Sequence, residues 1–339
     1  MKKGVTIKDI ARKLNMSVST VSKALSNDPS ISILTRERVQ QLAKEWNYIP
    51  NEAARHFKLN KSFTIGLIIP NLLDQFYVLA INGVEGIAEK QNYNVILTQS
   101  HEDVINEEKI TNMMISNRVD GVIVAITKNT VNMLLFQKLI SMGIPVVFIA
   151  REPQSQSFNF VSSNNQEGAF DATAFLIKKG HSRIAHIMGP ESMQTSQVRF
   201  EGYKQALIEH GISFDDALVK VADFSETATA NAMKELMKLK EPPTAVFTFK
   251  NYITLDAIEY LKDECPAQLD RIDFVGFGNL PLLQYLDHKP AASIEENSFE
   301  MGTQAAELLF RIINNKDADE NPSGENIRIP CRLVIHEHK

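Results

Sequence analysis

A run of short hydroxyl side chains near the N-terminus is the part of this chain best suited to polar recognition. The run reads SVSTVSKALSN and holds five serine and threonine residues: Ser17, Ser19, Thr20, Ser22 and Ser26. It also spaces three apolar residues as one face of a helix, at Val21, Ala24 and Leu25. Short hydroxyls let a helix approach phosphates and base edges closely, and each can donate or accept a hydrogen bond. The pattern indicates either a nucleic-acid contact or a solvated serine-rich face, and Val18 at its margin would contact a thymine methyl or extend the core.

No spacing of residues typical of an enzyme accompanies this run. The segment after one strand-like run reads GPESMQ rather than GxGxxG, and the sequence has no P-loop and no GxSxG elbow. The eight histidines are scattered, and the two cysteines, Cys265 and Cys331, have neither metal nor disulfide spacing. We therefore expect no catalytic residue, no metal ion and no cofactor.

Length and composition point to a soluble protein of several domains. The chain has 339 residues, 44% of them hydrophobic, which is enough for two or three domains with cores of their own. Its first residues, MKKGVTIKDIARK, contain no apolar segment of the kind that a signal peptide needs. No apolar run approaches the roughly 18 residues of a membrane span. We expect a cytoplasmic protein with no membrane partner, and a periplasmic solute receptor or an enzyme on the same fold is the less favoured alternative.

Charge is distributed unevenly along the chain. Residues 1–62 contain twelve Lys and Arg and five Asp and Glu, a net charge of +7, whereas the whole chain has −5 and the remainder therefore −12. A basic segment on an acidic body suggests a polyanionic partner for that segment alone, although a solvated lysine-rich terminus would give the same count.

Three short helices are predicted within this basic segment. The first follows Thr6, which begins a capping-box-like sequence with Asp9; the second runs from Ser17 to about Leu25, and the third follows Thr35. Two helices of about eight residues, joined by a turn of three or four residues and braced by a third helix, are typical of the helix-turn-helix motif.

Two segments of the sequence resemble the LacI/GalR family of bacterial transcription regulators, and the similarity continues through most of the chain. The segments read VTIKDIARKLNMSVSTVSKALSN and TRERVQQLAKEWNYIPNEAARHFKLNKS. The resemblance implies a transcriptional repressor, controlled by a small molecule, that binds a pseudo-palindromic operator as a homodimer. It also implies DNA contacts from Thr6, Ser17, Val18, Ser19, Thr20, Ser22, Lys23, Asn27, Tyr48, Asn51, Ala54 and Phe57. Lys23 stands where the family commonly has arginine, and lysine lacks the bidentate fork that reads guanine.

The resemblance further implies that residues 50–61 form a hinge helix that folds on DNA. Phe57 matches a leucine that enters the minor groove in the family, and phenylalanine can serve as a wedge between base steps. The alternative is that Phe57 packs the hinge against the body of the protein.

The rest of the chain alternates strand-like and helix-like segments. Apolar runs of strand length occur at 65–70, 93–99, 120–126, 144–150, 183–189, 244–249 and 272–278, with amphipathic stretches such as 76–90 and 167–179 between them. This βαβ pattern predicts an α/β fold with two doubly wound parallel lobes, which the resemblance makes periplasmic-binding-protein-like. The expected domains are a head at 1–49, the hinge at 50–61, a first lobe at 62–162 with 292–325, and a second lobe at 163–291 with 326–339. The last strand-like run, 327–337, is followed by no heptad segment, so a dimer rather than a tetramer is expected.

Effector-binding residues are implied by the resemblance at the carboxyl ends of the strands, where ligands of such sheets bind. They are Phe76, Tyr77, Gln99, Thr127, Arg151, Asn164, Arg199, Lys250 and Asn279. Phe76 and Tyr77 match aromatic residues that contact the ligand in the family, and Arg199 matches an arginine that binds ligand hydroxyls or carboxylates.

The predicted pocket departs from the family in its charge. Positions that commonly carry an acid in sugar-responsive members have none here: Ala150, Asn164, Lys250-Asn251 and Gly278-Asn279. Cations without carboxylates would leave an unpaired buried positive charge, which is costly. This predicts an anionic effector, a sugar acid or a sugar phosphate, with Lys250 and Arg199 as its charge partners. The alternative is that Lys250 pairs with Asp74 and that the effector is a neutral sugar.

Overall fold

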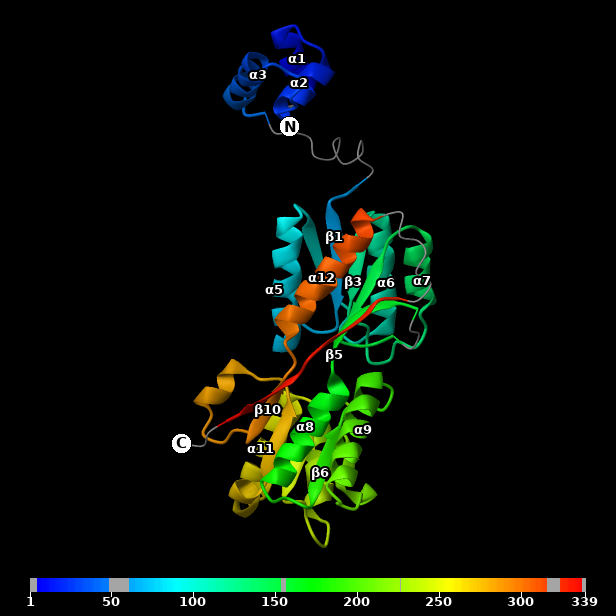
Figure 1. Ribbon diagram of the computed structural model, residues 1–339, viewed down its shortest axis with the longest axis vertical. Helices are drawn as coiled ribbons and strands as arrows, with labels where there is room; N and C mark the ends of the chain where they lie inside the picture. The colour runs from blue at the N-terminus through cyan, green and yellow to red at the C-terminus, as the bar shows by residue number, and fades with distance from the viewer. Residues whose placement is uncertain (1–4, 49–60, 154–156, 226, 316–323, 337–339) are drawn as a thin grey trace. The chain divides into compact units, whose positions relative to one another are not determined.

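The computed structural model describes residues 5–48, 61–153, 157–225, 227–315 and 324–336 (Figure 1). It divides into two units, Met1–Ser62 and Phe63–Lys339, each with its own core. The expected hinge helix, with Asn51, Ala54 and Phe57, lies outside the described residues.

The first unit contains the three predicted helices: α1 (Ile7–Leu14), α2 (Val18–Leu25) and α3 (Ile33–Glu45). The Thr6 backbone N–H donates to Asp9 Oδ2 at 3.0 Å, which confirms the predicted start of α1. The third helix begins earlier than expected, because the hydroxyl of Ser32 rather than that of Thr35 caps it and accepts the Thr35 backbone N–H at 3.3 Å. The helices enclose a core of six buried residues: Ile10, Ala11, Val21, Ala24, Val39 and Ala43.

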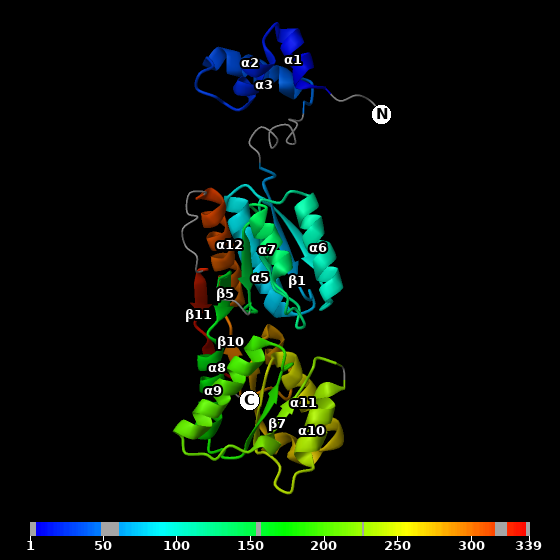
Figure 2. The ribbon, with the colours of Figure 1, turned by 90° about the vertical axis from the view of Figure 1, so that its right-hand side faces the viewer.

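The first lobe of the second unit is a six-stranded parallel sheet. Its strand order is β11-β5-β4-β3-β1-β2. The strands are β1 (Thr64–Ile69), β2 (Asn94–Gln99), β3 (Gly121–Val124), β4 (Val146–Ile149), β5 (Asn159–Ser163) and β11 (Asn326–Ile329). One face packs against α5 (Gln75–Lys90) and α12 (Ser298–Asn314), and the other against α6 (Val104–Ser116) and α7 (Leu134–Ser141), as Figure 2 shows.

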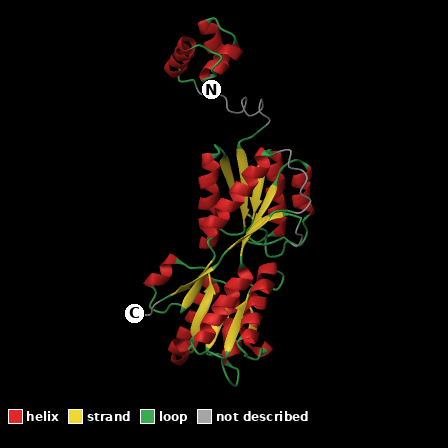
Figure 3. Ribbon diagram, viewed as in Figure 1, coloured by secondary structure: helices red, strands yellow, loops and turns green. Residues whose placement is uncertain are grey.

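The second lobe repeats this plan with the strand order β12-β10-β9-β8-β6-β7. Its strands are β6 (Ile184–Met188), β7 (Val219–Val221), β8 (Ala245–Thr248), β9 (Asp273–Phe277), β10 (Ala292–Glu295) and β12 (Arg332–Ile335), the last antiparallel to β10. Its helices are α8 (Asn165–Lys178), α9 (Gln194–Glu209), α10 (Ala228–Met237) and α11 (Asn251–Glu264), with 3₁₀ turns η1 (Asp216–Leu218), η2 (Pro266–Arg271) and η3 (Pro281–Tyr285). Helices cover both sheets (Figure 3), which confirms the expected pair of doubly wound lobes.

The chain crosses between the lobes three times: after β5, after β10 and between β11 and β12. The expected boundaries placed residues 292–325 in the first lobe and 326–339 in the second. Sheet membership differs at two strands, because β10 pairs with β9 in the second sheet and β11 pairs with β5 in the first. The run expected as one strand at 327–337 is divided at Pro330, which has no N–H to donate to either ladder.

Helices α5 and α12 pack closely because each presents a glycine to the other. A Cβ added at Gly302 would lie 1.9 Å from the Ala80 carbonyl oxygen, and one added at Gly83 would lie 2.2 Å from that of Phe299. Neither position has room for a side chain, so the two backbones must approach at this point.

His186 is a fully buried residue in the centre of the second lobe. Its ring stacks on Phe247 with centroids 4.5 Å apart, and its Nδ1 donates to the Phe247 carbonyl oxygen at 3.0 Å. Burial lowers the pKa of His186 to about 4. This side chain is therefore neutral in the folded protein at neutral pH.

We expect His186 to make the folded protein sensitive to acid. A histidine in the unfolded chain has a pKa of about 6.5. Between pH 6.5 and about 4 the unfolded state therefore binds a proton at His186 that the folded state does not bind. The contribution of His186 to the free energy of unfolding is therefore fully present above pH 6.5. It falls by up to about 3 kcal/mol as the pH is lowered from 6.5 to about 4. Urea unfolding of wild type and His186→Phe between pH 7.5 and 4.5 measures the effect. Parallel pH profiles of the two proteins would contradict it.

Candidate ligand pocket and DNA-binding face

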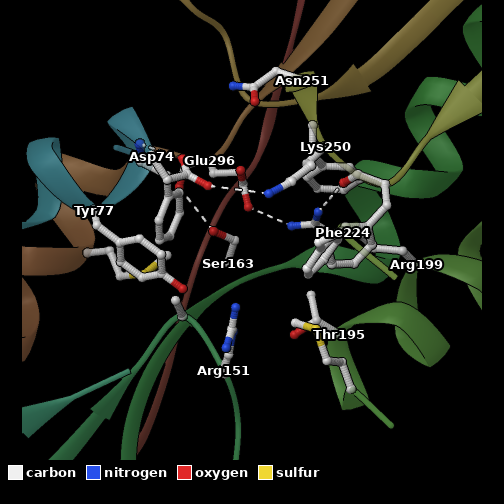
Figure 4. Close-up of a pocket in the computed structure, with 16 residues that line it drawn as sticks. Asp74, Tyr77, Arg151, Ser163, Thr195, Arg199, Phe224, Lys250, Asn251 and Glu296 are labelled. Atoms are coloured by element: carbon white, nitrogen blue, oxygen red, sulfur yellow. Dashed lines mark hydrogen bonds and ion pairs between the residues drawn. The ribbon is translucent and has the colours of Figure 1, made fainter. Parts of the chain in front are cut away.

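A pocket lies between the two lobes, beyond the carboxyl ends of their strands (Figure 4). It holds about 590 Å³ of space outside protein atoms, part of it open to solvent. The first lobe and the crossing segments contribute Asp74, Phe76, Tyr77, Ala150, Arg151, Ser163, Glu296 and Met301. The second lobe contributes Met193, Thr195, Arg199, Phe224, Phe249, Lys250, Asn251 and Phe277.

The guanidinium of Arg199 is fixed at the back of the pocket by contacts on all sides. Its Nη2 donates to Glu296 Oε1 at 2.6 Å, its Nε donates to Asn165 Oδ1 at 2.9 Å, and its Nη1 donates to the Phe249 carbonyl oxygen. The side chains of Arg199 and Glu296 are only 5% and 11% exposed. Burial lowers the pKa of Arg199 and raises that of Glu296, and in each case the partner's charge opposes the shift. The pair is therefore a buried ion pair that holds one wall of the pocket.

Lys250 faces Asp74 across the pocket. Its Nζ lies 3.9 Å from Asp74 Oδ2 and 4.3 Å from the centre of the Phe224 ring. Asp74 also caps α5, because its Oδ1 accepts the Phe76 backbone N–H at 3.1 Å. Burial lowers the pKa of Lys250, and the charge of Asp74 opposes that shift. Lys250 and Asp74 thus form a long ion pair, and both groups line the pocket.

Arg151 is the third cation of the pocket and is also paired. Its Nη2 and Nη1 donate to the two oxygens of Glu102 at 2.6 and 2.9 Å, and Nη1 donates to the Ile126 carbonyl oxygen at 2.7 Å. The expectation of an unpaired buried positive charge is therefore wrong. Three cations of the pocket face three carboxylates, and an anionic ligand is not needed for charge balance.

The hydroxyl of Tyr77 points into the pocket between these pairs (Figure 4). The side chain is buried, its ring packs edge-on against Phe76 with centroids 5.2 Å apart, and burial raises the pKa of Tyr77. Within the described part of the chain its hydroxyl bonds no other residue. Tyr77 thus offers a ligand one neutral donor and acceptor.

Five of the nine residues expected to bind the effector line this pocket: Phe76, Tyr77, Arg151, Arg199 and Lys250. The other four do not. Gln99 accepts the Leu72 backbone N–H at 2.9 Å, Thr127 is buried against Glu107 and Thr130, Asn164 precedes α8 and bonds Glu167, and Asn279 lies beyond β9, outside the lining. Polar side chains at strand ends also serve to fix turns, and their sequence position alone does not separate the two roles.

Asp74, named as the alternative partner of Lys250, lines the pocket and faces that lysine. Several other lining residues were not expected. The most important are Glu296, which supplies negative charge, and Phe224, Phe249 and Phe277, which supply aromatic surface. Phe224 and Phe249 follow strands β7 and β8, so their position at strand ends was a usable signal. Glu296 follows β10, a strand of only four residues that the sequence pattern did not predict.

The head presents the predicted polar face. Val18, Ser19, Ser22 and Lys23 are exposed on α2, while Val21 and Ala24 are buried beneath them. Other residues expected to contact DNA have structural bonds here, among them Ser17, whose Oγ accepts the Thr20 backbone N–H, and Asn27, whose Oδ1 accepts from Gln40. Thr6 begins α1, Ser26 bonds back to the Ser22 carbonyl, and Tyr48 packs against the head core.

The part of the chain that the structure describes contains no candidate metal site and no candidate membrane-spanning helix. Its histidine, cysteine and acidic residues form no group of three or more that could hold a metal ion. None of its helices combines the length and the apolar character needed to cross a bilayer.

Comparison with known proteins agrees with both units. Residues 6–51 match the family described as bacterial regulatory proteins, lacI family, and residues 62–337 match the periplasmic binding proteins and sugar binding domain of the LacI family. The HTH-type transcriptional repressor CytR of Escherichia coli strain K12 is 31% identical over 97% of this chain and 95% of its own length. Catabolite control protein A of Priestia megaterium is 29% identical over 98% of each chain.

Solved structures show the same architecture. The lac repressor dimer bound to operator and the anti-inducer ONPF superposes with a TM-score of 0.82 over 98% of each chain at 20% identity. The transcriptional regulator CelR in complex with cellobiose has a TM-score of 0.72 at 25% identity and covers 99% of this chain and 100% of its own. A helix-turn-helix head on a two-lobed ligand-binding body defines a ligand-controlled transcriptional regulator. The chain belongs to the LacI family of bacterial transcriptional regulators.

Proposed function

We propose that this regulator is a cytoplasmic repressor that binds a pseudo-palindromic operator as a homodimer through residues 1–60, under the control of a neutral, hydroxyl-rich ligand such as a sugar. The exposed arc of Val18, Ser19, Ser22 and Lys23 would read the major groove, since short side chains allow α2 to approach base edges. The relatives described as repressors, and the net charge of +7 over residues 1–62, support this assignment.

The observation that carries the choice of ligand is the pairing of every pocket cation with a carboxylate. Arg199 faces Glu296, Lys250 faces Asp74, and Arg151 faces Glu102. The charges balance when Glu102, which lies outside the lining and pairs with Arg151, is counted. The lining offers both donors and acceptors, which suits hydroxyl groups because each hydroxyl both donates and accepts. Aromatic rings around the pairs cover the apolar faces of a bound ring.

Matched pairs of ligands test this proposal. We expect a thermal-shift screen to find neutral sugars that stabilise the protein, and calorimetry to show that each binds at least about tenfold more tightly than its uronate or phosphate. An anionic group would face Asp74 or Glu296 as well as a cation, so its transfer from water would be poorly compensated.

Two lysine variants make the test specific. Lys250→Met should weaken binding of the neutral ligand by about tenfold or more, since it removes a charged hydrogen-bond donor. Lys234→Met, on the exposed side of α10, should leave binding unchanged. Tighter binding of the anionic member of a pair would overturn the proposed ligand class.

A further inference from the structure

Six described residues other than glycine and asparagine have left-handed backbone: Phe63 and Arg118 precede strands, and the other four follow strands. His101 and Glu102 follow β2 with φ of 55° and 57°, Ala150 follows β4 with φ of 67°, and Phe224 follows β7 with φ of 71°. This conformation costs residues with a side chain roughly 1–2 kcal/mol, so contacts with their surroundings must stabilise it. The contacts of Glu102 are therefore informative.

The Glu102 carboxylate joins two parts of the first lobe. Both of its oxygens accept from Arg151, whose guanidinium forms part of the pocket wall. Its Oε2 also accepts the Lys128 backbone N–H at 2.8 Å. One side chain thus positions a pocket residue and the loop that follows β3.

That loop reaches the second lobe through Lys128. The Nζ of Lys128 donates to the Asp223 carbonyl oxygen at 2.8 Å, and its own carbonyl oxygen accepts from Ser192 Oγ at 3.0 Å. Asp223 directly precedes Phe224, which lines the pocket. These hydrogen bonds form a path from Arg151 through Glu102 and Lys128 to Asp223. The path begins at the pocket wall of the first lobe and ends beside the pocket wall of the second.

A separate contact joins the lobes elsewhere. The Tyr252 hydroxyl of the second lobe donates to the Leu73 carbonyl oxygen of the first at 3.0 Å. Neither Tyr252 nor Leu73 bonds Glu102, Arg151 or Lys128 within the described residues. This contact serves as an internal comparison for the path through Glu102.

We propose that Glu102 is a positioning residue that couples the Arg151 wall of the ligand pocket to the Lys128 contact between the lobes. This inference rests on the proposed function, because a ligand that contacts Arg151 would alter the stability of the Lys128 contact between the lobes. The coupling is a property of the protein without ligand, and it is reciprocal. A change that weakens the Lys128 contact must therefore also weaken the contacts that position Arg151.

Amide hydrogen exchange of the purified full-length protein, without DNA or added ligand, tests the coupling. In Glu102→Ala we expect the amides of Lys128, Arg151 and, in the opposite lobe, Ser225 to exchange on the order of tenfold faster. Glu102→Gln keeps an acceptor for the Lys128 N–H and should restore protection at Lys128 more than at Arg151. Tyr252→Phe should leave all three amides unchanged.

A double-mutant cycle decides between coupling and mere support of a loop. Lys128→Met removes only a half-exposed side chain and should accelerate exchange at Arg151 in the wild-type background, but not in Glu102→Ala. Additive effects of the two substitutions, or an unchanged Ser225 amide in Glu102→Ala, would overturn the proposal. Failure of ligand or DNA binding would not affect these measurements, so the two proposals fail independently.

Discussion

The Arg199→Met variant is expected to lose about 3–5 kcal/mol of unfolding free energy, the largest loss that we expect from a single substitution in this chain. The substitution leaves Glu296 buried with no partner, so its carboxyl must remain charged in an apolar site or take up a proton, and either is a costly way to break a buried ion pair. Asn165 Oδ1 and the Phe249 carbonyl oxygen also lose their donor. Urea unfolding at pH 7 measures the loss.

Two further variants control for this result. Arg183→Met removes an ion pair to Asp215 whose side chains are 28% and 40% exposed, and it should cost at most about 1 kcal/mol. The double variant Arg199→Met/Glu296→Met should recover much of the loss, because the guanidinium lies 3.5 Å from the centre of the Phe277 ring and an apolar chain suits that site. A loss below about 1 kcal/mol in Arg199→Met, or a double variant as unstable as the summed single variants, would contradict a buried charged pair.

The affinity for operator DNA is expected to fall by about 10³–10⁵ when salt is raised from 50 to 200 mM, for a proposed dimer that neutralises six to ten phosphates. The physical reason is counterion release by the basic residues of 1–62, which hold twelve Lys and Arg. Fluorescence anisotropy with a duplex selected from a random pool measures the slope of log affinity against log salt.

Single lysines locate the source of this salt dependence. Lys23 is exposed on α2, so Lys23→Met should reduce the slope by about 0.9 for each phosphate that its ammonium group neutralises, whereas Lys234→Met on the body should not change it. A slope near zero in the wild type would exclude phosphate binding by the head.

The sequence was most informative where periodicity follows directly from burial. Each head helix buries two residues that lie within one helical turn of each other, so the head helices were predictable: Ile10 and Ala11, Val21 and Ala24, and Val39 and Ala43. Seven predicted strands correspond to β1–β4, β6, β8 and β9. Most are apolar because helices cover both faces of each sheet, whereas β2 lies at an edge and is partly exposed. The pattern missed β5, β7 and β10, and it predicted β11 and β12 as one strand at 327–337. The pairing of β11 with β5 joins distant parts of the chain and leaves no local signal.

The pocket was predictable only in part, for a similar reason. Arg199 and Lys250 are placed by the ends of strands and the starts of helices, which the pattern locates. The partner of Arg199 is 97 residues away in the chain, and no local signal connects Glu296 to it. The net charge of a pocket is set by such distant pairs, so positive residues counted along a sequence overstate the charge that a ligand would meet.

The three crossings between the lobes also constrain how the protein is made. Neither lobe is one continuous length of chain. Helix α12 and strand β11 complete the first lobe only after β6, β7, β8, β9 and β10 of the second have been synthesised, and β12 joins the second sheet after β11. Met301, Leu308 and Leu309 of α12 belong to the core of the first lobe. On the ribosome, where domains generally fold as they emerge, the nascent first lobe lacks α12 beside α5 on one apolar face of its sheet and lacks β11 at the β5 edge. Exposed apolar surface and an unpaired strand edge make such an intermediate prone to aggregation until α12 and β11 are in place.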